Sequence, residues 1–245
     1  MRHHPFLALL GLSLFSLNYL LFYYAAFDLA TGLLAVIFST MTVMNIFNSA
    51  IFLRRQIQKK TVLAVVFGLT GMALVFWPEI TTSGPRVAAA IGISLIATYL
   101  ASIGNIVSAR NQNHGLPVAS TNTIGMAYGA LFMLAYSAGS GAPFVIDTST
   151  TYIGSLLFLA LFASAIAFGC YLTLVGRIGP ANAAYATVLF PIVALALSTW
   201  FEDYEWQNRA LVGVGLILIG NAIVLSRPGL ISPLKTLSSR GQNND

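Results

Sequence analysis

Apolar residues gather in long runs along the chain, and short polar stretches that often contain glycine or proline separate these runs. The runs cover residues 5–27, 29–53, 61–78, 87–109, 117–138, 152–175, 180–200 and 210–226. Each is close to the roughly 20 residues that an α-helix needs to cross a bilayer. They do not alternate in the manner of barrel strands, which are only about ten residues long. The pattern predicts an all-α integral membrane protein with about eight transmembrane helices.

The composition agrees with a surface that faces lipid rather than water. Hydrophobic residues make up 57% of the chain and charged residues 8%, and the mean hydropathy is +0.81. A soluble domain carries roughly 25% charged residues, so a soluble globule is excluded. Because Cys170 is the single cysteine, neither an intrachain disulfide nor a cysteine metal cluster can form. The net charge of +5 is spread over the loops and indicates membrane orientation rather than nucleic-acid binding.

Basic residues lie mostly on one side of the predicted bundle. With the N-terminus in the cytoplasm, the inside segments hold Arg2, Arg54, Arg55, Lys59, Lys60, Arg110, Arg177, Arg227, Lys235 and Arg240. The outside loops hold only Arg86 and Arg209. Ten basic residues against two is the bias that the positive-inside rule describes. It predicts that both termini are cytoplasmic, and the compact loops fit a bacterial inner (plasma) membrane.

The chain carries signs of an internal repeat. A shift of 149 residues lays the first three runs on the last three and brings Gly71 onto Gly220. Since the first run begins inside and the sixth begins outside, the two triplets are inverted, as in many secondary transporters. We expect a first half at 1–80 with three helices, a second half at 87–226 with five, and a polar cytoplasmic tail at 227–245. On this reading, two helices of the first half would precede Met1.

Short segments follow one another in a characteristic order. They are Tyr23-Tyr24-Ala25-Ala26, Gly68 to Phe76, Arg177 to Tyr185, Leu189-Phe190-Pro191, Phe201-Glu202 and Gly213 to Asn221. Together they resemble the EamA type of the drug/metabolite transporter superfamily. The resemblance implies ten helices in two inverted repeats of five, and export or exchange of small metabolites, amino acids among them. It also implies that Leu53-Arg54-Arg55 replaces a glutamate common in the family, which Glu202 matches in the second half.

The polar side chains inside the predicted runs are uncharged. All histidines, acids and basic residues fall in the predicted loops or tails, so neither a proton relay nor a general base is expected within the membrane. We therefore expect no enzyme, no catalytic residue, no metal site and no cofactor. In the run 87–109, the residues Ser94, Thr98, Ser102 and Asn105 recur on one helical face. This spacing predicts a polar stripe that faces the bundle interior.

Uncharged groups also define the expected substrate cavity. Its residues are Asn18, Tyr19, Tyr99, Asn105, Tyr171, Asn182 and Tyr185. Hydroxyl, amide and aromatic groups suit a polar organic or zwitterionic solute, and suit a bare ion or a multiply charged phosphate poorly. Pro191 removes a backbone hydrogen bond and is the expected helix hinge. The alternative role for such polar groups is to hold helices together, as the GxxxG pattern of Gly125 and Gly129 is expected to do.

The expected function is that of a secondary transporter, an exporter of small organic solutes that works by alternating access. Its partners are the solute and the lipid bilayer, with no nucleic acid. Pairing of two copies as a homo-oligomer would restore the wall that the two further helices normally form. The alternative is a truncated or partner-dependent membrane protein without transport activity of its own. An enzyme that acts on lipid at the membrane surface, through Glu202 or His114, is a third and weaker hypothesis.

Overall fold

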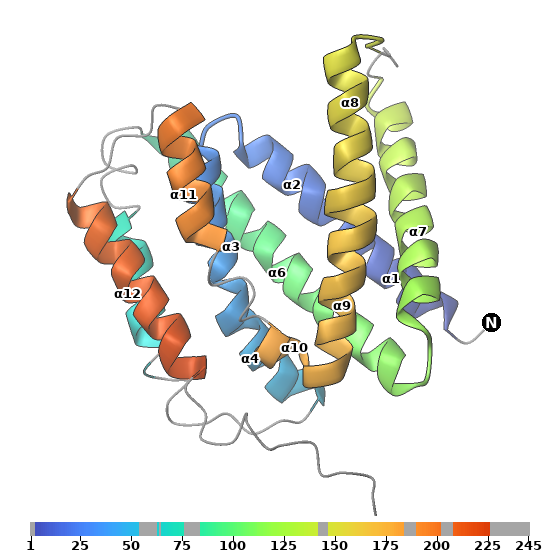
Figure 1. Ribbon diagram of the computed structural model, residues 1–245, viewed down its shortest axis with the longest axis horizontal. Coiled ribbons are helices and arrows are strands. Elements are labelled where there is room, and N and C mark those ends of the chain that lie inside the picture. Colours follow the sequence, from blue (N-terminus) through green and yellow to red (C-terminus); the bar gives the residue numbers. More distant parts are fainter. Residues whose placement is uncertain are drawn as a thin grey trace, which may run out of the picture.

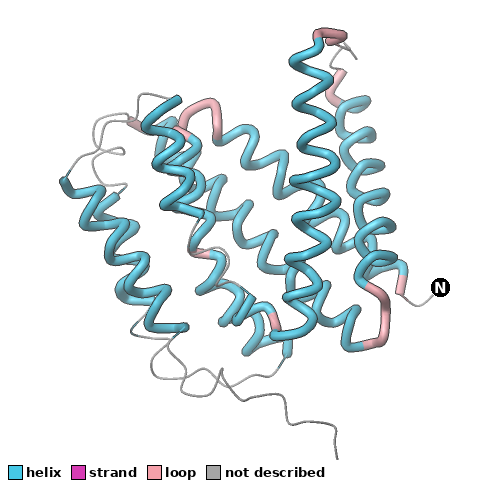
Figure 2. Tube along the Cα trace, viewed as in Figure 1, coloured by secondary structure: helices cyan, strands magenta, loops and turns pink. Residues whose placement is uncertain are grey.

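The chain folds into a bundle of helices (Figures 1 and 2). The computed structural model describes residues 3–53, 63, 65–75, 84–141, 147–183, 190–201 and 208–225. Within those residues, five helical stretches are long and apolar enough to cross a membrane, namely His4–Ala25, Thr31–Leu53, Pro85–Asn113, Val118–Gly139 and Thr150–Ile178. Three shorter helices are Val65–Val75, α11 (Phe190–Phe201) and α12 (Asn208–Leu225). The predicted all-α membrane fold is confirmed, and every predicted run contains one of these helices.

The first two spans are interrupted helices. The first consists of α1 (His4–Leu12), the π-helical turn η1 (Ser13–Leu17) and α2 (Asn18–Ala25), and the second of α3 (Thr31–Ser39) and α4 (Met41–Leu53). The second span breaks at Thr40, whose N–H bonds to the Ile37 carbonyl, three residues back, at 3.0 Å. The Thr40 hydroxyl donates to the same carbonyl at 2.6 Å. Hydroxyls that bond back to the helix backbone bend it, which explains a break that the continuous apolar run does not predict.

Helix α6 (Pro85–Asn113) runs through the middle of the bundle (Figure 1). It begins at Pro85, whose fixed φ suits a first helical position. It ends just before Gly115, which has a φ of +78° and follows His114. The helix extends four residues beyond the predicted end at 109, so Arg110 lies in its last turn rather than in a loop. There the Arg110 guanidinium lies 3.3 Å from the centre of the Phe6 ring.

The remaining described segments of the second half follow α6 along the chain. They are α7 (Val118–Gly139), α8 (Thr150–Phe158), the π-helical η2 (Leu159–Ile166), α9 (Ala167–Ile178) and the short α10 (Pro180–Ala183). Segments α8, η2 and α9 form one long rod beside α7 (Figure 1). Gly179 separates α9 from α10 with a φ of +85°, a conformation that favours glycine because it has no β-carbon.

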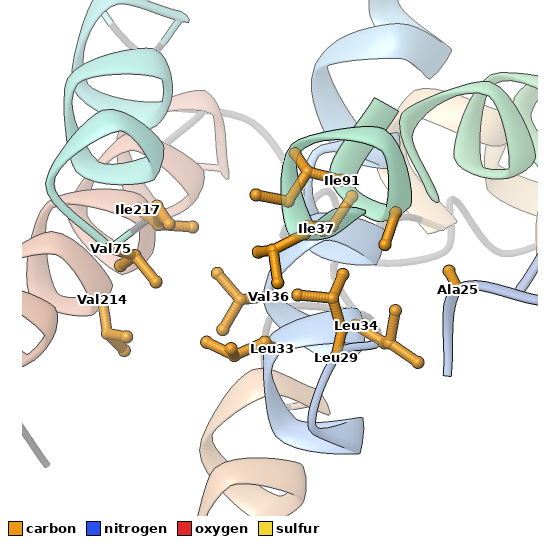
Figure 3. Packing of buried hydrophobic residues seen from close by; sticks show 12 residues of the cluster. Ala25, Leu29, Leu33, Leu34, Val36, Ile37, Val75, Ile91, Val214 and Ile217 are labelled. Atoms are coloured by element: carbon orange, nitrogen blue, oxygen red, sulfur yellow. The ribbon is translucent and has the colours of Figure 1, made fainter. Parts of the chain in front are cut away.

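Two apolar clusters hold the helices together. Figure 3 draws the first, in which Leu33 and Val36 of α3 lie between Ile91 of α6 and the side chains of Val75 and Ile217. The second cluster joins α1, η1, α4, α6, α9 and α10 through Leu10, Leu14, Phe15, Met41, Ala101, Val107, Ala109, Leu172, Val175 and Ala183. Helix α6 contributes to both clusters, so it is the common support of the bundle.

Glycine allows two helix pairs to approach each other closely. A β-carbon on Gly11 of α1 would lie 2.5 Å from the Gly125 carbonyl oxygen of α7, and one on Gly129 would lie 2.9 Å from Phe15. The GxxxG pattern of α7 therefore packs against the first span, as the sequence predicts. In the same way, β-carbons on Gly71 and Gly213 would lie within 2.6 Å of each other's carbonyl oxygen.

Candidate functional site

The polar stripe of α6 is buried along its whole length. Ser94, Thr98, Ser102 and Asn105 have no exposed surface, and Ser108 is 1% exposed. The hydroxyls of Ser94 and Thr98 donate to the carbonyls of Ala90 and Ser94 within α6, both at 2.8 Å. Ser102 and Asn105 instead bond to side chains of other helices. The C-terminal part of the stripe, at Ser102 and Asn105, is therefore where α6 makes polar contacts with other helices.

A cluster of uncharged polar residues lies where α4, α6, α9 and α10 meet. The Asn105 amide donates to the Tyr171 hydroxyl at 3.2 Å and to the Met41 sulfur at 3.4 Å. On α4, Asn48 donates to the Ser102 hydroxyl at 2.8 Å and Asn45 to the Pro180 carbonyl at 3.4 Å. We call Met41, Asn45, Asn48, Ser102, Asn105 and Tyr171 the junction cluster.

The junction cluster contains more hydrogen-bond acceptors than the described chain satisfies. The amide oxygens of Asn45 and Asn105 are buried, and no donor from the described residues reaches them. The same holds for the hydroxyl of Ser49, one turn after Asn45 on α4. Buried polar groups in proteins almost always have a partner. The two amide oxygens of the cluster and the neighbouring Ser49 hydroxyl therefore make this region the strongest candidate for binding in the described part of the molecule.

Interrupted helices adjoin the cluster. Helix α9 ends at Ile178, and the chain turns at Gly179 before α10. The Pro180 carbonyl beside Asn45 belongs to the first residue of α10, directly after this turn. On the other side, Met41 is the first residue of α4, directly after the break at Thr40. Such interruptions leave backbone carbonyls free for a ligand and supply hinge points, as in the discontinuous helices of transporters.

A groove lies between α2 and α7, near the ends of both helices. Its volume is about 680 Å³, and it is lined by Tyr19, Leu20, Tyr23, Tyr24, Met133, Tyr136, Ser137 and Ser140. The hydroxyls of Tyr24 and Tyr136 are 2.6 Å apart and bridge the two helices. The groove therefore offers aromatic faces and hydroxyl groups, and none of its lining side chains is an acid or a base.

Aromatic rings connect the groove with the junction cluster. Tyr19 meets Phe168 edge to face, with ring centres 6.3 Å apart, and Phe15 meets the same ring at 5.3 Å. Phe168 lies one helical turn before Tyr171 on α9. Aromatic rings therefore lie between the groove and the junction cluster.

The structure brings together some of the predicted cavity residues and separates others. Asn105 and Tyr171 are bonded to each other, and Tyr19 lines the groove. Asn18 is buried, and its amide donates to the Ala97 carbonyl at 2.7 Å, a bond that also fits a packing role. Tyr99 is 46% exposed, so its side chain lies off the buried stripe.

The remaining predicted residues lie in or near residues 184–189, which the structure does not describe. Asn182 belongs to α10, but its side chain is outside the description, and so is all of Tyr185. Pro191 is the second residue of the described part of α11, directly after the residues that the structure leaves out. Its role as a hinge stays a prediction.

Several residues of the site were not predicted from the sequence. Asn48 follows Asn45 by three residues, and this i, i+3 spacing on an apolar run was a usable signal. The Met41 sulfur, the Pro180 carbonyl and the Tyr24–Tyr136 pair carry no such signal, because their partners are distant in the sequence. Among the described residues, no group of three or more His, Cys, Asp or Glu side chains could hold a metal ion.

The long apolar helices and the uncharged polar interior define an integral membrane protein that crosses the bilayer several times. Its family follows from the sequence, because the profile of the EamA-like transporter family matches residues 2–77 and 88–226. The chain belongs to this family and is a membrane transporter. A small-molecule solute and the lipid bilayer are accordingly its partners.

Individual relatives agree with this assignment. A protein of Clostridium kluyveri described as an uncharacterized transporter is 23% identical over 238 residues, which cover 96% of this chain and 76% of that protein. A protein of Salmonella typhimurium described as a probable amino-acid metabolite efflux pump is 24% identical over 204 residues, covering 79% and 67% of the two chains. A solved crystal structure has a similar fold, with a TM-score of 0.64, 14% identity, and coverage of 91% and 74%.

Proposed function

We propose that this chain is a secondary transporter that exports small organic solutes of the amino-acid or metabolite class by alternating access. The observation that carries the proposal is the junction cluster, a buried set of uncharged polar side chains beside interrupted helices. Transporters bind their substrates near the middle of the membrane, at sites that discontinuous helices form. Binding groups without charge favour a solute that is itself neutral overall or zwitterionic.

The arrangement of the cluster in the chain supports alternating access. Its residues come from α4 in the proposed first half, 1–80, and from α6 and α9 in the proposed second half, 87–226. The two segments that match the family, 2–77 and 88–226, have nearly the same bounds as these halves. In transporters built from inverted repeats, the substrate site lies at the interface of the repeats, where rocking of one half exposes it to either side.

The proposed solute class and direction rest on the groove, the charges and one relative. The positive-inside bias favours cytoplasmic termini and a bacterial inner membrane, so that the groove at the ends of α2 and α7 opens outward. Solute would then pass from the junction cluster along Phe168 and Tyr19 to the groove. The name of the Salmonella relative, an amino-acid metabolite efflux pump, points to the same class of solute.

A second candidate function is that of a chain that transports only together with a partner or a second copy. The observation in its favour is the long rod at 150–166, where α8 and η2 have no buried residue at all. Large side chains such as Phe158 and Phe162 are 60% and 55% exposed. Lipid or a helix of another chain could cover such a surface. In a transporter that works only as a pair, this rod would be exposed in the single chain and buried in the complex.

Flux through purified protein tests the proposal. The full chain in proteoliposomes should exchange at least one labelled solute from a panel of amino acids and related metabolites. Asn105→Ala should lower that exchange at least about tenfold, because a lost hydrogen bond to a charged or strongly polar group costs about 1.5 kcal/mol or more. Asn122→Ala is the matched control, since Asn122 is also buried but lies on α7, outside the cluster.

The outcome separates the two candidates. If the chain exchanges no solute in any oligomeric state, the proposed transport is wrong. Exchange that appears only in the fraction containing two or more copies favours the second candidate. Equal losses in Asn105→Ala and Asn122→Ala would mean that the junction cluster is not the substrate site.

A further inference from the structure

The side-chain amides of Asn45 and Asn105 have partners for their N–H groups but none for their oxygens among the described residues. Both side chains have no exposed surface. The donors are used, by the Pro180 carbonyl for Asn45 and by Tyr171 and Met41 for Asn105. The amide oxygens accept no bond from the described residues, and neither does the Ser49 hydroxyl. A buried acceptor without a partner destabilises the folded chain, so the site favours a ligand that donates several hydrogen bonds.

The polarity of the site identifies which ligand group fits. An ammonium group has three N–H donors and no acceptor, which suits the two unpaired amide oxygens and the Ser49 oxygen. A carboxylate or a phosphate offers only acceptors and could take a bond from the Ser49 hydroxyl but would meet lone pairs at both amide oxygens. Hydrogen bonds in which the donor is charged are roughly twice as strong as neutral ones. Uncharged oxygens can accept such bonds from an ammonium group, so the site needs no buried acid.

The groups next to the site leave these oxygens to the solute. The Pro180 carbonyl, on the first residue of α10, accepts the Asn45 amide and so does not compete as a donor. Arg110, a basic residue on the last turn of α6, does not compete for these oxygens. Its guanidinium lies over the Phe6 ring and bonds to Asn111.

We propose that the oxygens of Asn45, Asn105 and Ser49 form a subsite for the protonated amine of the solute. This inference rests on the proposed function and adds to it the group that the cluster recognises. The rest of the solute extends along the rings of Tyr171 and Phe168 toward Tyr19, so an aromatic or aliphatic amine fits best. Because Asn45 and Asn105 are completely buried, the amine reaches them only when the bundle opens.

Three probes that share a phenyl ring test the subsite. The full chain in lipid nanodiscs is unfolded thermally with 2-phenylethylamine, 2-phenylethanol or 3-phenylpropionate, whose polar ends are cationic, neutral and anionic. A ligand that binds only the folded state raises the midpoint as its concentration exceeds the dissociation constant. We expect the amine alone to raise it. Equal shifts with all three probes, or a shift with the anion only, would overturn the proposal.

Substitutions then locate the effect. Asn45→Ala and Asn105→Ala should each weaken binding of 2-phenylethylamine at least about tenfold, since each removes one hydrogen bond to a charged group. Asn122→Ala should bind it as the unchanged chain does, although its own amide oxygen is likewise buried without a partner among the described residues. Equal weakening in Asn122→Ala would contradict the assignment to this cluster.

Asn105→Asp covers the case in which the alanine variants do not fold. It keeps the size of the side chain and places a carboxylate beside the proposed amine, so binding should tighten about tenfold. Misfolding cannot produce tighter binding, so unchanged or weaker binding in a folded Asn105→Asp protein would overturn the subsite. An inorganic cation is tested alongside, and stabilisation by sodium chloride over choline chloride without an effect of the amine would also overturn it.

Flux of the same three probes in proteoliposomes separates this inference from the proposed function. Binding of the amine without flux of any probe supports the subsite and contradicts transport. Flux of the alcohol or the anion in preference to the amine supports transport and overturns the subsite. Flux of the amine that is lost in Asn45→Ala supports both.

Discussion

At the scale of the residue, Tyr171 has the most defined role in the junction cluster. Its hydroxyl accepts the Asn105 amide at 3.2 Å and so joins α9 to α6. Within the same helix, Phe168 turns its ring toward Phe15 and Tyr19. One turn of α9 therefore presents a polar contact and an aromatic contact to the interior, which is what a site for a solute with a polar and an apolar end requires.

Tyr171→Phe removes the hydroxyl and leaves the ring. The Asn105 amide then loses its oxygen acceptor in a buried setting, so the free energy of unfolding should fall by about 1–2 kcal/mol. Unfolding of the variant in nanodiscs by a denaturing detergent would measure this change. Tyr152→Phe on the exposed helix α8 is the control and should have no effect. Equal stability of the two variants would show that the Tyr171 hydroxyl makes no net contribution.

At the scale of the element, glycine decides how closely the helices pack. The first span and α7 approach each other at Gly11, Gly125 and Gly129, where any β-carbon would lie within 3.2 Å of the opposite helix. Small residues matter especially in a bilayer, because lipid chains are as apolar as leucine and helices associate mainly through close packing. The same contact positions α2 and α7 as the two walls of the groove.

Gly129→Ala should push the first span away from α7. Its β-carbon would lie 2.9 Å from the Phe15 carbonyl oxygen, a backbone atom that cannot rotate away. We expect a loss of about 1–3 kcal/mol in the free energy of unfolding, as for other overpacked sites. A thermal scan in nanodiscs would measure it.

Gly92→Ala in α6 provides the matched control for that scan. A β-carbon on Gly92 would meet no atom within 4 Å. Since alanine favours helices over glycine by about 0.5–1 kcal/mol, this variant should be as stable as the unchanged chain or slightly more stable. If Gly129→Ala were the more stable of the two, the close approach of η1 in the first span to α7 would be contradicted.

At the scale of the whole molecule, the ends of α7 provide a test of orientation. His114 and Ser140 cap α6 and α7, at opposite ends of the 22 residues of α7. That length corresponds to about 33 Å, enough to cross the hydrocarbon core of a bilayer. The two positions therefore lie on opposite sides of the membrane, and the proposed orientation puts His114 in the cytoplasm.

Labelling with a membrane-impermeant maleimide in intact cells tests that orientation. The exposed Cys170 is first replaced by Cys170→Ser. Ser140→Cys should then react in intact cells, whereas His114→Cys should react only after the cells are made permeable. The reverse pattern would place both termini outside, and reaction of both positions in intact cells would contradict the assignment of α7 as a span.

The sequence alone determined the class of the protein and the places of its helices. The length and apolarity of a run decide whether it crosses a bilayer, and neither depends on the other helices. The burial of the stripe from Ser94 to Ser108 also followed from its spacing, since uncharged polar groups avoid lipid. The break at Gly179 likewise falls between two predicted runs. By contrast, the break at Thr40 lies inside one apolar run and depends on local hydrogen bonds.

Only the tertiary structure decided which polar groups meet. Tyr24 and Tyr136 are 112 residues apart, and Asn45 and Pro180 are 135 apart. No periodicity in the sequence relates such positions, because the crossing of two helices sets the partners of each side chain. Packing likewise left the oxygens of Asn45 and Asn105 without a donor from the described residues. The residue type determines which hydrogen bonds a side chain can make. The fold determines which of them other parts of the protein already make and which remain for a solute.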